Sequence, residues 1–220
     1  GSERLQRELG VPAKRCHVIP HGTFTHLAEI ENPAPLPPHL AEVEGPVVLC
    51  FGLMRPYKGL DVAIEAWRGI ENAELWIVGM PRMDTAALKN SAPSNVRFVE
   101  RFIDDREIAA FFERADLALL PYREIDHSGV CFTALAFGTP MLLSDVGGFP
   151  EIAAAGAAEL VPSGDAAALR SALERLLADH DARQQLAQGA VAAASDLYDW
   201  DRVAALHLEL YSKLLGGGAQ

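Results

Sequence analysis

The sequence predicts an α/β protein built on a Rossmann-like, doubly wound parallel sheet. Short β-branched or apolar runs alternate with helical patterns from about residue 46 onward, which is typical of parallel strands covered by helices on both faces. Apolar residues make up 50% of the 220 residues, enough to fill a sizeable core. The expected strands are Val47–Gly52, Glu74–Gly79, Val96–Val99, Leu117–Leu120, Met141–Leu143 and Ala158–Val161.

Helices are expected wherever apolar residues recur every three or four positions. The strongest such patterns cover Leu60–Gly69, Arg106–Ala115, Val130–Phe137, Ala166–Ala178, Ala182–Ala194 and Asp201–Leu215. The three tryptophans at helix or strand positions, Trp67, Trp76 and Trp200, are interpreted as packing anchors.

The first 45 residues differ from the rest of the chain. A short helix at Glu3–Leu9 is followed by "RCHVIPHGTF" and by a proline-rich loop, Pro33–Pro38. The segment is too short for a second domain, so residues 3–45 are interpreted as an interdomain linker and entry segment, and residues 46–199 as the ligand-binding domain. Residues 1–2, Gly-Ser without an initiator Met, are interpreted as a cloning scar.

Composition narrows the range of partners. The net charge of −11 argues against a nucleic acid bound through its phosphates, although local bases and helix amides can still bind a small anion. The three cysteines and the scattered histidines lack metal spacing, so we expect no metal site, reduced and mostly buried thiols, and a cytoplasmic protein. No apolar run reaches the length of a membrane span, and no signal peptide is recognised.

The loops that follow the strands are the place to look for a binding site, because open parallel sheets bind ligands at the carboxyl ends of their strands. In "GLMRPYKG", residues 52–59, Gly52 lets the backbone turn, and Arg55 and Lys58 put two cations at a helix start. An anionic ligand would neutralise that charge. The alternative is that both are surface bases paired with neighbouring acids.

"PYREIDHSG", residues 121–129, precedes a second helix start. The amides of Gly129, Val130 and Cys131 are expected to point out of the sheet edge, with Ser128 capping the helix or donating to a ligand. This pattern predicts a phosphate seat. Thr133, one turn deeper, either meets a ribose hydroxyl or bonds back to its own helix carbonyl.

Other residues near these loops are ambiguous from sequence alone. Asp126 either caps the helix, accepts from a sugar hydroxyl or fixes His127, which is itself either a ligand contact or an exposed loop histidine. Arg123 and Glu124 could form a local ion pair. Phe102 and Ile103 could face a nucleobase, and Asp104 or Asp105 is expected to cap the next helix. The paired glycines of "SDVGGFP", residues 144–150, permit a close approach of the backbone.

The order of these motifs resembles that of the retaining group 1 (family 4) glycosyltransferases, specifically the carboxyl-terminal half of their two-domain GT-B fold. The matching segments are "VIPHGTF", "VVLCFGLMRPYKGLDVAIEAW", "ELWIVG", "VRFVERFIDD", "ADLALLPYREIDHSGVCFTALAFGTPMLLSDVGGFPEI" and "WDRVAALHLELYSKLL". Gly22, in the first segment, and Gly52 are the loop glycines of the predicted site.

The resemblance implies a nucleotide-diphosphate-sugar donor, with a UDP-sugar as the first candidate and a GDP-sugar as the second. It also implies transfer of a hexose with retention of the anomeric configuration, commonly without a divalent metal. It places the base near residues 100–105, the diphosphate on Arg55, Lys58 and Ser128–Val130, and the ribose near Thr133. Two glutamates common in the family are missing here, at Ile125 and Thr133.

The resemblance also implies a partner domain. An amino-terminal domain would form the acceptor side of the cleft, and residues 200–220 would pack back toward that domain. Peripheral membrane association would be mediated by the same domain. We therefore expect the isolated chain to bind donor weakly and to transfer nothing; the catalytic residues and the acceptor stay unknown. Two alternatives are a GT-B nucleotide-sugar epimerase, for which only Asp126 and His127 offer acid/base groups, and a noncatalytic mononucleotide-binding or interaction module.

Overall fold

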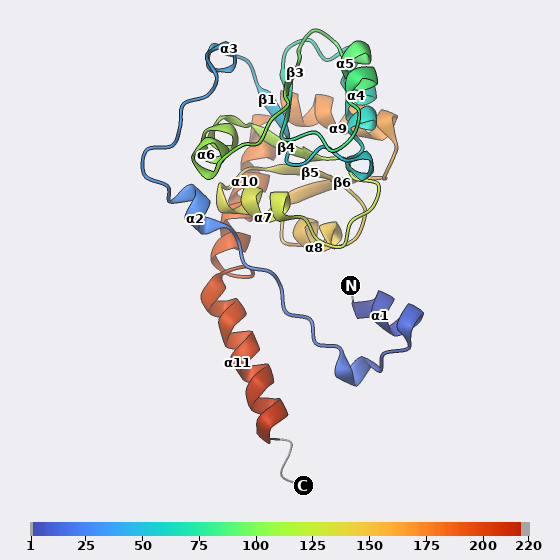
Figure 1. Cartoon of the computed structure of the whole chain (residues 1–220), viewed down its shortest axis with the longest axis vertical. Helices are drawn as coiled ribbons and strands as arrows, with labels where there is room; N and C mark the ends of the chain where they lie inside the picture. The colour runs from blue at the N-terminus through green and yellow to red at the C-terminus, as the bar shows by residue number, and fades with distance from the viewer. Residues whose placement is uncertain (1, 217–220) are drawn as a thin grey trace.

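The protein is built on one six-stranded sheet that is covered by helices on both faces (Figure 1). The computed structural model describes residues 2–216. All strands are parallel, in the order β3-β2-β1-β4-β5-β6. They are β1 (Val47–Phe51), β2 (Glu74–Val78), β3 (Val96–Val99), β4 (Leu117–Leu120), β5 (Met141–Ser144) and β6 (Ala158–Val161). The predicted fold class and all predicted strands are confirmed to within one residue.

The predicted helices are also present, with ends shifted by no more than about two residues. The larger helices are α4 (Leu60–Trp67), α6 (Asp105–Arg114), α7 (Gly129–Ala136), α9 (Ala166–Ala178), α10 (His180–Ser195) and α11 (Trp200–Gly216). The smaller ones are α1 (Ser2–Leu9), α2 (Thr25–Ala28), α3 (Pro38–Ala41), α5 (Ala86–Ser91), α8 (Phe149–Ala154) and the 3-10 turns η1 (Ala13–Arg15) and η2 (Pro56–Lys58).

The sheet separates two apolar cores because successive strand residues face opposite sides. Leu49 and Trp76 lie in the core under α6, α7, α8 and α10, whereas Cys50 and Trp67 lie in the core under α4, α5 and α9. Both tryptophans are fully buried, as expected of packing anchors. Burial on both faces explains why the strands read as continuous apolar runs.

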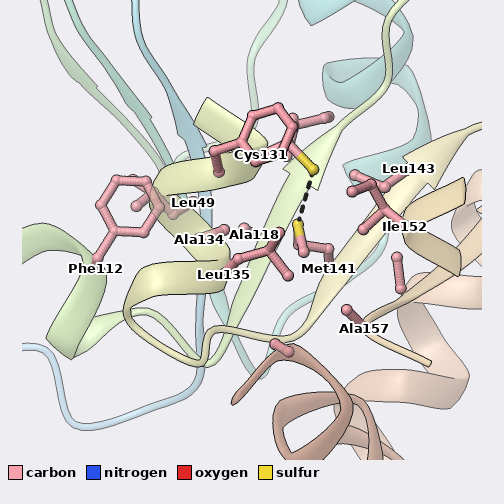
Figure 2. Close-up of a cluster of buried hydrophobic side chains, with 14 of the residues drawn as sticks. Leu49, Phe112, Ala118, Cys131, Ala134, Leu135, Met141, Leu143, Ile152 and Ala157 are labelled. Carbon is pink, nitrogen blue, oxygen red and sulfur yellow. Dashed lines mark hydrogen bonds between the residues drawn. The ribbon is translucent and has the colours of Figure 1, made fainter. Parts of the chain in front are cut away.

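Helix α7 is fixed on the sheet by its buried face. Figure 2 shows Cys131 directed at Met141 of β5, with their sulfur atoms 3.5 Å apart. Burial raises the pKa of the Cys131 thiol to about 12, and that of the Cys50 thiol likewise, so both behave as small apolar residues. The expectation that these cysteines are buried and unpaired is confirmed, and the first turn of α7 has a rigid base.

The two ends of the described chain extend away from the sheet. In Figure 1, α1 lies apart from the domain and α11 projects beyond it, and the outer part of α11 exposes Leu208, Leu214 and Leu215. The packing of α11 against a further domain stays a prediction. No helix among residues 2–216 is long and apolar enough to cross a membrane.

Gly22 serves packing in this structure. A Cβ at Gly22 would come within 2.4 Å of the Trp200 ring, and the Trp200 indole N–H donates to the carbonyl of Thr23 at 2.7 Å. Trp200 is 48% exposed, so it anchors the start of α11 from the surface and not from within the core. Thr23 and Leu40 are fully buried, which ties part of the segment predicted as a linker to the domain.

Asp104→Ala is expected to lower the free energy of unfolding by about 1 kcal/mol, because Asp104 is the residue that caps α6. Its carboxylate accepts from the N–H groups of Arg106 and Glu107 at 3.0 and 3.2 Å, while the Glu107 carboxylate accepts from the N–H of Asp104. Urea denaturation measures the loss. Asp105→Ala is the matched control, since Asp105 is exposed and caps nothing. Equal losses in the two variants would contradict this assignment.

Candidate functional site

The strand order brings two loops together at one edge of the sheet. The order reverses between β1 and β4, and in open α/β sheets such a switch point opens a crevice at the carboxyl ends of the strands. The loop after β1 and the loop after β4 meet there: the N–H of Arg123 donates to the Tyr57 carbonyl at 2.7 Å, and a Cβ at Gly59 would lie 2.0 Å from the Pro121 carbonyl oxygen.

Arg123 holds the two loops together through a partner that the sequence did not suggest. Its guanidinium donates to the Asp61 carboxylate at 2.9 Å and to the Pro56 carbonyl at 3.0 Å. The hydrogen bond from Arg123 lowers the pKa of Asp61. A local ion pair with Glu124 is therefore wrong, because Asp61 lies across the switch point within reach of the planar guanidinium.

Lys58 is buried in this junction. Its side chain is in the last turn of η2, two residues before α4 begins, and the residue is 5% exposed. The ammonium donates to the Phe51 carbonyl and to the Tyr122 hydroxyl, both at 2.8 Å. Burial lowers the pKa of Lys58 to about 8. The ammonium has three donors, so one remains for a further acceptor.

Gly52 leaves the Lys58 ammonium open toward α7. Its φ is +97°, a conformation that side chains rarely adopt. A Cβ placed there would lie 3.0 Å from the Lys58 nitrogen and 3.1 Å from a Val130 methyl carbon. Because glycine carries no side chain, the buried ammonium and the first turn of α7 face one another across the position that a side chain would otherwise occupy.

The first turn of α7 offers free backbone donors. Neither the Gly129 N–H nor the Val130 N–H makes a hydrogen bond within residues 2–216. Ser128 is buried and does not cap the helix; its hydroxyl lies 3.5 Å from the Tyr122 hydroxyl. Free N–H groups at a helix start carry partial positive charge and bind anions. Of the two roles predicted for Ser128, side-chain capping is wrong and donation to a ligand stays a prediction. The N–H groups of Gly129 and Val130 stay available to a ligand.

Arg55 completes the set of positive groups. Its side chain is exposed and makes no hydrogen bond or ion pair with another residue of the described part of the chain. It shares the loop of Lys58, so one exposed and one buried cation flank the junction. A planar guanidinium suits the oxygens of a phosphate. The arrangement can therefore hold a doubly charged anion without a metal.

Some predicted site residues have other roles. The Thr133 hydroxyl donates to the Gly129 carbonyl at 3.0 Å, so the back-bonding alternative describes the structure and a ribose contact stays a prediction. Phe102 is 67% exposed in the loop after β3, whereas Ile103 is buried in the core. Of this pair, only Phe102 has a free face for a nucleobase.

A cavity of about 470 Å³ lies beside the junction. Ser128 and His127 form one side of it, and Asp126 precedes them on the exposed surface of the same loop. The sequence reasoning missed four residues of the site: His21, Glu151 and Tyr198, which line the cavity, and Tyr122, which bonds Lys58. His21 falls in "VIPHGTF", and its ring lies 5.0 Å from that of Phe132, but nothing local in the sequence brings residue 21 to α7.

A protein-family model described as Glycosyl transferases group 1 matches residues 45–179, more than half of the chain. The chain belongs to the group 1 glycosyltransferases. The predicted resemblance is thereby confirmed, and the family assignment covers both loops of the switch point.

Individual relatives within this family transfer mannose. The chain is 33% identical over 80% of its length to the phosphatidyl-myo-inositol mannosyltransferase of Mycobacterium leprae, and 30% identical over 90% of its length to a GDP-mannose:glycolipid 4-beta-D-mannosyltransferase of Xanthomonas campestris pv. campestris. It covers 49% and 55% of those proteins. The chain thus spans about half the length of the curated relatives it matches.

A solved structure of Anabaena HepE in complex with UDP has the same fold. It aligns with a TM-score of 0.79 over 96% of this chain and 60% of that one, at 20% identity. The likeness shows a shared doubly wound fold, and the match to the family model makes this domain a group 1 glycosyltransferase domain.

This group 1 glycosyltransferase domain has no carboxylate at residues 125 and 133, the two positions at which the resemblance predicts glutamates. Ile125 is half-buried against the core, and Thr133 is buried with its hydroxyl bonded to the helix. Glu151, at the start of α8, is the carboxylate that lines the neighbouring cavity. Residues 2–216 contain no group of three or more His, Cys, Asp or Glu side chains that could hold a metal ion.

Proposed function

We propose that this domain binds the nucleotide-diphosphate sugar of a retaining hexosyltransferase, with the diphosphate at the junction of β1 and α7. The observation that carries the proposal is the position of Gly52, where a Cβ would lie 3.0 Å from the buried Lys58 ammonium and 3.1 Å from a Val130 methyl carbon. The ammonium therefore lies beside the first turn of α7, in which the Gly129 and Val130 N–H groups have no partner among the described residues. A diphosphate would supply the acceptors that these donors lack, and Arg55 would close over it from solvent.

The donor sugar would occupy the cavity beside the seat. His127 and Glu151 would meet its hydroxyl groups, with Asp126 at the entrance, while the base would extend toward the exposed ring of Phe102. UDP is the first candidate, supported by the UDP complex of Anabaena HepE, and GDP is the second, supported by the GDP-mannose specificity in the name of the Xanthomonas relative.

Because the chain spans about half the length of its relatives, we propose that an amino-terminal domain supplies the acceptor side and that this chain alone binds donor without transferring sugar. The three free cysteines support a cytoplasmic, reducing environment for it.

Calorimetry with UDP, GDP and ADP tests the donor site, and Arg55→Ala makes the test specific. We expect the preferred nucleotide to bind roughly tenfold more weakly to Arg55→Ala, because one charge-assisted contact is lost. The midpoint of thermal unfolding should stay unchanged, since Arg55 has no partner among the described residues. Arg68→Ala is the control: Arg68 is equally exposed but lies at the far end of α4.

The absence of binding by all three nucleotides in a folded sample would refute the proposed function. Sugar transfer by the isolated chain would refute the requirement for a second domain.

A further inference from the structure

Tyr122 lies between the two parts of the proposed diphosphate site, Lys58 and the start of α7. It follows β4 directly and is 3% exposed. Its hydroxyl oxygen accepts from the Lys58 ammonium at 2.8 Å and lies 3.5 Å from the Ser128 hydroxyl, immediately before the first turn of α7. The Tyr122 hydroxyl therefore contacts both the Lys58 ammonium, in the loop after β1, and Ser128, the residue before α7.

The Tyr122 ring is held in place independently of its hydroxyl. It makes an edge contact with Tyr57 at 5.7 Å and a tilted contact with Phe149 at 5.4 Å between ring centroids. The Lys58 nitrogen also lies 4.9 Å from the Tyr122 ring centroid. Removing only the hydroxyl should leave the ring where it is, so the function of the hydroxyl can be separated from that of the ring.

We propose that Tyr122 is a positioning residue: its hydroxyl holds the Lys58 ammonium protonated and aimed at Gly52, toward the diphosphate. The inference rests on the proposed donor site. The only other acceptor for the ammonium among the described residues is the Phe51 carbonyl. With Tyr122 in place, two fixed acceptors direct the third donor of Lys58 outward.

The pH dependence of binding follows from the burial of Lys58, whose pKa lies at about 8. A neutral amine binds a diphosphate poorly, so affinity should be full below this pH and fall as the pH rises through it. The titratable groups near Tyr122 are Tyr57 in the loop after β1, Cys50 on β1 and Cys131 in α7, and Cys50 also lies near Lys58. Arg55 and His127 lie in the same two loops. Burial raises the pKa of the Cys50, Cys131 and Tyr122 groups, which therefore stay neutral in this range.

Losing the Tyr122 hydroxyl removes a hydrogen bond that stabilises the charged form of Lys58. We expect Tyr122→Phe to shift the pH at which affinity falls downward by about one unit. Relative to the wild type, the variant should then bind about tenfold more weakly near pH 9 but only about twofold more weakly near pH 7, by the same one-unit shift.

The experiment is calorimetric titration with UDP, or with GDP if GDP binds more tightly, across this pH range. Tyr57→Phe is the matched control, because it removes a neighbouring phenol hydroxyl that makes no hydrogen bond with the described residues. It should follow the wild-type profile. A wild-type profile for Tyr122→Phe would overturn the positioning role and leave the donor site standing, whereas no binding by the wild type would overturn both.

A second measurement needs no nucleotide. NMR titration of carbon-13-labelled lysine reports the protonation of each ammonium group, and the chain has only four lysines to resolve, namely Lys14, Lys58, Lys89 and Lys213. We expect the Lys58 signal of the wild type to titrate near pH 8, and to move lower in Tyr122→Phe. An unchanged Lys58 titration in Tyr122→Phe would overturn the inference.

Discussion

Lys58→Met is expected to weaken the binding of the preferred nucleotide by roughly 10- to 100-fold at pH 7, the loss of one charge-assisted contact in a desolvated site. Methionine keeps most of the side-chain volume among its buried neighbours but brings no charge and no donor. The effect should exceed that of Arg55→Ala, because the buried Lys58 is screened much less by water than the exposed Arg55. Calorimetry measures both losses under the same conditions.

The substitution also leaves the Phe51 carbonyl and the Tyr122 hydroxyl without the Lys58 donor, so some loss of stability is expected. Circular dichroism must therefore show that the variant is folded at the temperature of the titration. Lys89→Met is the control, since Lys89 pairs with Glu100 on the exposed surface of α5. Undiminished affinity in folded Lys58→Met would remove Lys58 from the site.

Gly147→Ala is expected to lower the free energy of unfolding by about 3 kcal/mol or more, from left-handed backbone strain and steric overlap together. Gly147 has φ +55°, and a Cβ there would lie 1.8 Å from the Ile125 carbonyl oxygen. The loop after β5 thus packs directly on the stretch that leads to Ser128. Because the added methyl group must push that stretch away, nucleotide affinity should fall as well.

Gly164→Ala separates the two causes of this loss. Gly164 has φ +78°, but a Cβ there would meet nothing within 4 Å. Gly164→Ala should lower the free energy of unfolding by about 1 kcal/mol, because only the backbone strain contributes. Nucleotide binding should stay unchanged. Equal losses of stability in urea denaturation of the two alanine variants would show that the contact with Ile125 does not matter.

The sequence predicted the helices and strands well, and also the edge of the sheet at which the candidate site lies. The strands were predicted well because each is a short apolar run, buried on both faces and bounded by turn residues. The candidate loops followed from the same prediction, since parallel strands end at a common edge. The sequence thus predicted that Arg55, Lys58 and Gly129 lie in one region.

The details of the site were not predictable in the same way. The sequence predicted Lys58 as an anion-binding cation but gave no sign that it is buried. Ser128 was predicted to cap α7 or to donate to a ligand, and its hydroxyl lies beside that of Tyr122. Glu124 was a possible partner for Arg123, which pairs with Asp61 in the structure. Gly22 was assigned to the site, yet its position is required by the Trp200 ring. In each case the deciding partner is distant along the chain.

By itself, the sequence determined the fold class, the element boundaries and the family, because apolar periodicity and motif order are properties of neighbouring residues. Only the tertiary structure decided which groups keep free donors. Strand order places β4 beside β1, so Tyr122 meets Lys58 although 64 positions separate them. Hydrogen bonds and burial depend on that pairing in space, and no local pattern encodes it.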